Sequence, residues 1–109
     1  MPVRGIRGAT VAAADTPEAI RAATRELMLA LIEANGVLPE DVASVIFTAT
    51  PDLTAEAPAR AARELGWQEA ALMCMAEMNA AVGLARCIRV LIHWNSDKRT
   101  DEIHHIYLH

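Results

Sequence analysis

The chain has 109 residues, 53% of them apolar and 4% aromatic, which suits one domain with a modest core filled by alanine and aliphatic side chains. Its formal net charge of −4 argues against nucleic acid as the main partner, because no basic stripe is present to neutralise phosphates. No apolar run reaches transmembrane length and the N-terminus lacks a signal-like apolar segment, so we expect a cytoplasmic protein without a membrane partner.

The first third of the chain predicts a strand followed by a long helix. Residues 3–11 form the strand, and the two glycines within it indicate a close approach of another part of the backbone. Thr16 as N-cap and Pro17 at the first helical position start the helix. Asn35 and Gly36 end it with a left-handed cap. Its buried stripe repeats at helical spacing and consists of Ile20, Leu27, Met28, Leu31 and Ile32.

The remainder alternates strand-like runs with loops and one short helix. A helical turn is expected at 39–42, and a second helix begins at Pro58 and runs to about Leu65, where Gly66 stops it. Residues 79–85 are expected to form a loop and residues 95–101 a polar turn. The strand-like runs are residues 43–50, 70–75, 87–94 and 103–108.

This order predicts a single α+β domain spanning residues 1–109. Helical crossovers join the first strands and loops join the later ones, which favours a mixed five-stranded sheet with the helices packed on one face. The other face of the sheet carries apolar residues as well and needs a cover. We expect another copy of the chain to provide it.

Charged residues inside apolar runs point to a functional site. Arg89 lies in residues 87–92, the most apolar strand-like run, and a guanidinium buried there needs an anionic partner. Glu77 ends another apolar run, and Arg4 and Arg7 lie on the first strand. We interpret these residues as a site for a small anion. The alternatives are that Arg89 and Glu77 form a purely structural ion pair, and that Arg4 is an exposed residue of an edge strand.

The cysteines and histidines point to neither a disulfide nor a metal site. Cys74 and Cys87 lack CxxC spacing and lie in apolar strand patterns, where small buried thiols are common. His104 and His105 are adjacent on a predicted strand, so their side chains point to opposite faces and cannot easily bind one metal ion. The other histidines are His93 and His109.

Six motifs follow one another in a fixed order along nearly the whole chain. They are residues 4–10, 48–53, 58–65, 74–78, 83–84 together with 87–90, and 103–108. As a set they resemble the bacterial monofunctional chorismate mutases of the trimeric α+β type. The resemblance implies a homotrimer, described as a pseudo α/β barrel, with substrate sites between neighbouring subunits.

The resemblance also implies a reaction, the pericyclic rearrangement of chorismate to prephenate in aromatic amino-acid biosynthesis. It implies no nucleophile, general acid, metal or cofactor. The substrate is a dianion, and negative charge builds on its ether oxygen as the C–O bond breaks, so a fixed cation aimed at that oxygen is the expected catalyst. The enzyme must also hold the flexible substrate in its compact, reactive conformer.

Individual roles carry over from the family to matching positions of this sequence. Arg89 matches the arginine that donates to the ether oxygen, and Arg7 matches a carboxylate-binding arginine. Glu77 matches the acid that accepts from the ring hydroxyl and helps to hold the arginines. The further substrate-contacting positions are Cys74, Tyr107, Arg63, Arg60 and Met73, with Arg60 standing where the family often has lysine.

Two departures from the family pattern bear on affinity. Ala57, the remaining substrate-lining position, stands where the family commonly has a phenylalanine that walls the pocket. The sequence ends at His109, where relatives continue with a basic tail that helps to close the site. We expect both departures to affect substrate affinity more than the chemical step. The alternative functions are a trimeric enamine or imine deaminase of related fold, and a non-catalytic binder of small carboxylates.

Overall fold

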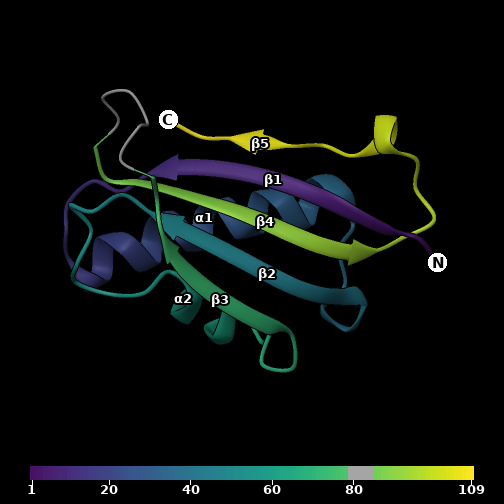
Figure 1. The fold of residues 1–109 in the computed structure, drawn as a ribbon, viewed down its shortest axis with the longest axis horizontal. Coiled ribbons are helices and arrows are strands. Elements are labelled where there is room, and N and C mark those ends of the chain that lie inside the picture. The colour runs from purple at the N-terminus through teal and green to yellow at the C-terminus, as the bar shows by residue number, and fades with distance from the viewer. Residues whose placement is uncertain (79–84) are drawn as a thin grey trace.

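The computed structural model describes residues 1–78 and 85–109 and contains a five-stranded sheet with two helices on one face (Figure 1). The expected loop at 79–85 falls almost entirely outside these residues. The predicted α+β class with a mixed sheet is confirmed. The elements are β1 (Val3–Val11), α1 (Pro17–Asn35), β2 (Val42–Ala49), α2 (Ala59–Glu64), β3 (Ala71–Ala76), β4 (Cys87–Asn95) and β5 (Ile106–Tyr107), with 3-10 turns at Pro39–Asp41 and Thr100–Glu102.

The sheet order is β3-β2-β4-β1-β5, so the strand latest in the chain lies at one edge and β3 lies at the other (Figure 1). The central strand β4 runs antiparallel to both β1 and β2. The two edge strands are parallel to their neighbours, β3 to β2 and β5 to β1. Strands that are distant in sequence therefore lie side by side. In particular, β1 with Arg7 is adjacent to β4 with Arg89.

Helix α1 has the predicted boundaries, and its caps explain them. The Thr16 hydroxyl accepts a hydrogen bond from the amide of Ala19 at 3.1 Å, which satisfies a free donor of the first turn. Gly36 adopts the left-handed conformation at φ 72°, and its amide donates to the carbonyl of Ile32 at 2.8 Å. The face packed on the sheet consists of Ile20, Thr24, Leu27, Met28, Leu31 and Asn35, all buried.

One of the two glycines predicted to allow close approach does so. A Cβ atom on Gly8 would lie 3.0 Å from Cδ1 of Leu31 and 3.1 Å from both Cδ1 of Leu27 and the carbonyl oxygen of Ile106. Gly8 therefore lets α1 and β5 both pack closely against β1. Gly5 has only an ordinary contact in the same test, with Leu91 at 3.6 Å.

Helix α2 is shorter than the predicted helix, covering six residues from Ala59 to Glu64. Pro58 occupies the N-cap position without a side-chain hydrogen bond, and Gly66 at φ 94° ends the segment as expected. A helix of this length is marginal by itself, because few hydrogen bonds offset the entropy of nucleation. Its position depends on tertiary contacts, among them the buried side chains of Ala61 and Ala62.

The predicted last strand at 103–108 is wrong in its first half. Only Ile106–Tyr107 pairs with β1. The side chain of Asn35 binds the preceding backbone, since its Oδ1 accepts from the amide of His104 at 2.8 Å and its Nδ2 donates to the carbonyl of His104 at 2.9 Å. The amide and carbonyl of His104 thus pair with a side chain instead of a strand.

The exposed thiol of Cys74 corrects another expectation. Cys87 is buried as predicted, but Cys74 lies on the edge strand β3, whose residues are largely exposed, and both thiols are free. The edge position explains the difference, because β3 has a neighbour on one side only. Among the described residues, no helix is long and apolar enough to cross a membrane.

Candidate active site

The sheet face turned away from the helices carries the predicted cations. In β1, Ile6 and Gly8 are buried towards the helices, so Arg7 between them projects from the opposite face. The same alternation in β4 places Ile88 and Val90 inside and Arg89 outside. The strand register brings the two arginines close, because Arg7 pairs with Leu91 and Arg89 lies two residues before it.

Glu77 follows β3 directly and is fixed by both its backbone and its side chain. Its amide donates to the carbonyl of Ala49 at 2.9 Å, and its Oε1 accepts from the hydroxyl of Thr48 at 2.7 Å. Nη1 of Arg89 lies 3.4 Å from each carboxylate oxygen. The Thr48 hydrogen bond and then the charge of Arg89 hold the pKa of Glu77 below its ordinary value, against the opposing effect of burial.

The predicted anionic partner of Arg89 is therefore present, but the predicted burial of Arg89 is wrong for the single chain. The Arg89 side chain is 56% exposed, whereas that of Glu77 is 14% exposed. Arg89 extends from the uncovered face of the sheet, so one end is held by Glu77 and the rest of the guanidinium faces open space. Its N–H groups that do not contact Glu77 remain available to a ligand.

A hollow of about 250 Å³ lies beside this pair. It brings together four residues that were predicted from different parts of the sequence: Arg7, Glu77, Arg89 and Tyr107. Two cations, a carboxylate and a phenol thus line one concave surface. Its remaining lining residues are Gly8, Ile46, Thr48, Val90 and Leu91.

Tyr107 reaches this hollow because β5 is attached to β1. The amide of Leu108 donates to the carbonyl of Ala9 at 2.8 Å, and the register places Tyr107 opposite Ala9. The imidazole Nδ1 of His105 accepts from the amide of Arg7 at 3.0 Å. The His105 imidazole therefore takes the place of a backbone hydrogen bond between strands, just before β5 begins.

The other predicted site residues lie elsewhere. Ala57, Arg60 and Arg63 line a second hollow of about 530 Å³ at α2, which has no lining residue in common with the first. Met73 and Cys74 lie on β3 and line neither hollow. The motif at 83–84 lies outside the described residues. In residues 1–78 and 85–109, no group of three or more histidine, cysteine or acidic side chains is arranged to hold a metal ion.

The comparison with protein families decides the family. The model of the family described as chorismate mutase type I matches residues 3–109. The chain belongs to the chorismate mutase type I family.

Two curated relatives in this family are both named chorismate mutase AroH. The protein from Thermus thermophilus is 50% identical over 107 residues, covering 97% of this chain and 88% of the relative. The protein from Bacillus subtilis strain 168 is 48% identical over 109 residues, covering 99% and 86%. A solved structure of a chorismate mutase from Clostridium thermocellum has a TM-score of 0.93 and 46% identity, covering 96% of this chain and 94% of that one.

Sequence reasoning missed two residues that contact members of the candidate site. Thr48 donates to Glu77, and His105 accepts from Arg7. The alternation of residues 43–50 could have placed the Thr48 side chain on the same sheet face as Arg89, but only if β2 and β4 were known to be neighbours. For His105 no sequence signal was present, because its contact depends on a strand that begins later than predicted.

Proposed function

We propose that this chain rearranges chorismate to prephenate, and that Arg89 is its principal catalytic residue. The supporting observation is the pairing of Arg89 with Glu77 beside a hollow that Arg7 and Tyr107 also line, in a member of this family. A hollow with two cations suits a dianionic substrate. The family membership makes chorismate the expected one.

The chemical step needs charge stabilisation at one oxygen. As the C–O bond of chorismate breaks, negative charge accumulates on the ether oxygen, and a guanidinium already in place stabilises that charge without reorganising. Glu77 holds Arg89 from one side, which leaves its other N–H groups to donate to that oxygen. Because Thr48 and Arg89 keep the pKa of Glu77 low, the ion pair persists in mildly acidic solution.

Substrate orientation falls to the other residues of the first hollow. Arg7 binds a carboxylate of the substrate, and the phenol of Tyr107 reaches a carboxylate from the opposite edge of the site. Glu77 accepts a hydrogen bond from the ring hydroxyl. Fixing these groups selects the compact conformer, in which the atoms that form the new bond are adjacent.

A homotrimer completes the site by joining two hollows from different subunits. In one chain the first hollow lies on the uncovered sheet face and the second lies at α2, with no residue shared. The edge strand β3 exposes Met73 by 54% and Met75 by 47%, and Tyr107 beside the first hollow is 61% exposed. Apolar side chains this exposed favour contact with another subunit.

The proposed contribution of the neighbouring subunit comes from α2 and β3. Its residues are Ala57, Arg60, Arg63, Met73 and Cys74. Each is exposed in the single chain, so each can contribute to the subunit interface or to the site formed there. Ala57 presents only a methyl group there, so its apolar contact with the substrate is small.

The decisive experiment follows the ultraviolet absorbance of chorismate during incubation with the purified protein and no added cofactor. We expect prephenate to form much faster than in buffer. Disappearance of chorismate at the buffer rate would refute the proposal. In that case, ammonia release from an enamine would identify a deaminase, and binding of a bicyclic transition-state mimic no tighter than chorismate would identify a non-catalytic binder.

A further inference from the structure

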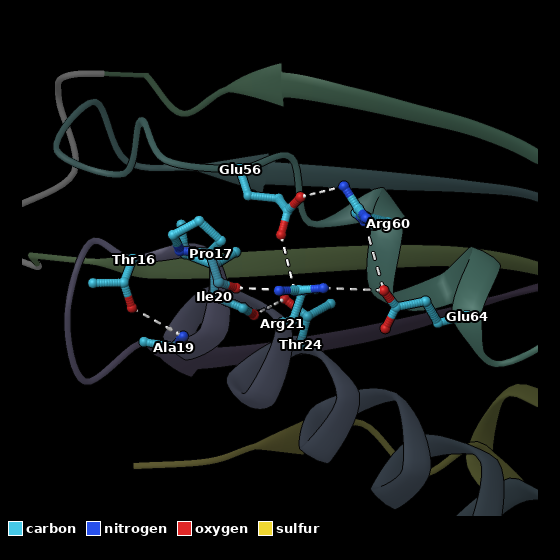
Figure 2. A network of polar contacts seen from close by, with 9 residues as sticks. All are labelled: Thr16, Pro17, Ala19, Ile20, Arg21, Thr24, Glu56, Arg60 and Glu64. Atoms are coloured by element: carbon cyan, nitrogen blue, oxygen red, sulfur yellow. Dashed lines mark hydrogen bonds and ion pairs between the residues drawn. The ribbon is translucent and has the colours of Figure 1, made fainter.

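Four charged side chains beside the second hollow form a closed ring of alternating sign. Nε of Arg21 lies 3.0 Å from Oε2 of Glu56, and its Nη1 lies 3.4 Å from Oε1 of Glu64. Arg60 closes the ring, with Nη1 3.0 Å from Oε1 of Glu56 and Nε 3.6 Å from Oε1 of Glu64. Figure 2 shows Arg21 reaching between the two carboxylates, with Arg60 joining them on the other side.

The ring joins three segments that carry or support the second hollow. Arg21 belongs to α1, Glu56 precedes Ala57 in the connecting loop, and Arg60 and Glu64 belong to α2. Because α2 has six residues and no side-chain N-cap bond, it needs such external attachment. Arg21 itself is steadied by a hydrogen bond from its Nε to the carbonyl of Pro17 at 3.3 Å.

Glu56 is the least exposed member, at 12%, and Arg60 is 59% exposed. The buried Oε2 of Glu56 is held by its ion pair with Arg21, and a buried carboxylate without a cation is strongly unfavourable. The two positive and two negative formal charges of the ring also sum to zero. The charge of Arg60 is therefore largely balanced before any ligand arrives.

Arg63 differs from Arg60 in this respect. It is exposed and lines the same hollow, and within the described residues its guanidinium has no ion-pair partner or hydrogen-bond acceptor. All five of its N–H donors are open to an anion. A cation that is not in an ion pair attracts a dianion more strongly than one held between two carboxylates.

We propose, building on the function proposed above, that Arg60 is a positioning residue: Arg21, Glu56 and Glu64 hold it in the ring, and the ring places Arg63, the substrate-binding cation of that proposed function. The ring holds both ends of α2 against α1, through Arg60 and Glu64, and so sets the place of Arg63 between them. Arg21 and Glu56 thereby influence substrate affinity without touching the substrate.

Steady-state kinetics on chorismate test this division of roles. We expect Arg63→Met to raise KM at least tenfold. Arg21→Met and Arg60→Met should each raise KM about threefold with kcat nearly unchanged, and the double variant should resemble either single one, because the ring acts as a unit. Arg25→Met removes an exposed α1 cation outside the ring and should leave KM unchanged. An Arg60→Met effect as large as that of Arg63→Met, with Arg21→Met silent, would overturn the proposal.

Glu56→Gln separates positioning from simple charge. Removing a negative charge near a dianionic substrate should lower KM if only the overall field matters. If the ring positions Arg63, the same variant raises KM because the attachment of α2 is lost. A fall in KM would therefore contradict the proposal.

Hydrogen exchange provides a readout that does not depend on turnover. Arg21→Met and Glu56→Gln should accelerate amide exchange in residues 59–66, while Arg25→Met should not. Unchanged exchange in the ring variants would refute the positioning role even if the wild-type protein proved inactive. If the ring variants exchange faster but the wild-type protein has no mutase activity, the positioning role is supported and only the proposed reaction is refuted.

Discussion

Arg89 is the residue on which the chemistry depends. Replacing it with alanine should raise the activation barrier by about 3 kcal/mol, equivalent to a loss on the order of 10²-fold in kcat, as for other fixed donors to a developing oxyanion. KM should change less, since the interaction strengthens in the transition state. Rapid-quench or steady-state assays measure this effect. Arg99→Ala is the matched control and should leave kcat unchanged, because Arg99 is 75% exposed and, among the described residues, pairs only with the nearby Asp101 and Glu102. An Arg89→Ala enzyme with unchanged kcat would contradict the assignment.

The hydroxyl of Thr48 controls the ionisation of Glu77. The folded-state pKa of Glu77 is lowered, so its ionic contribution to stability is present above the ordinary pKa of 4.5 and is lost as the pH falls through the lower folded value. Thr48→Val removes the largest cause of the shift. The pKa of Glu77 should then rise, and the acid limb of kcat/KM should move to higher pH.

Carboxyl NMR titration and the pH profile together measure this change. Thr48→Ser retains the donor and should keep the wild-type profile. A Thr48→Val profile that coincides with that of Thr48→Ser would show that the hydroxyl has no such influence.

At the level of secondary structure, Gly8 governs how three elements meet. A methyl group there would press on α1 and on the backbone of β5, so Gly8→Ala should destabilise the fold by about 1–3 kcal/mol. Urea unfolding measures the loss. Gly5→Ala on the same strand meets only an ordinary contact at 3.6 Å and serves as the control. Equal stability of the two variants would mean that α1 and β5 shift without cost.

At the level of the whole molecule, a shared site predicts rescue between two defective chains. Arg89→Ala damages the first hollow and Arg63→Glu reverses the charge in the second. In a cyclic trimer every mixed assembly contains one site with both halves intact, so random subunit exchange should restore about a quarter of the wild-type activity.

Separately purified trimers mixed without exchange should remain at the parental activities. Sizing would show that the mixtures with exchanged subunits consist of trimers. If those mixtures also kept the parental activities, both halves of the site would have to come from one chain.

Much of the local structure was predictable because its signals are local. Thr16, Pro17 and Gly36 determine where α1 begins and ends, since each acts within one helical turn. Alternating apolar residues located four of the five strands to within a residue or two. The Arg89–Glu77 pair was also foreseen, because a guanidinium in an apolar strand needs an anion.

What the sequence determined by itself was the succession of elements, the family, and the types of residue at the candidate site. Only the tertiary structure decided the strand order, the pairing of Asn35 with the backbone before β5, the exposure of Cys74, and the hydrogen bond from Thr48 to Glu77. It also separated Arg60, inside a charge ring, from Arg63, which has no ion-pair partner within residues 1–78 and 85–109. Caps and periodicity depend on neighbours a few residues apart, whereas these features depend on contacts between residues brought together only when the sheet and helices assemble.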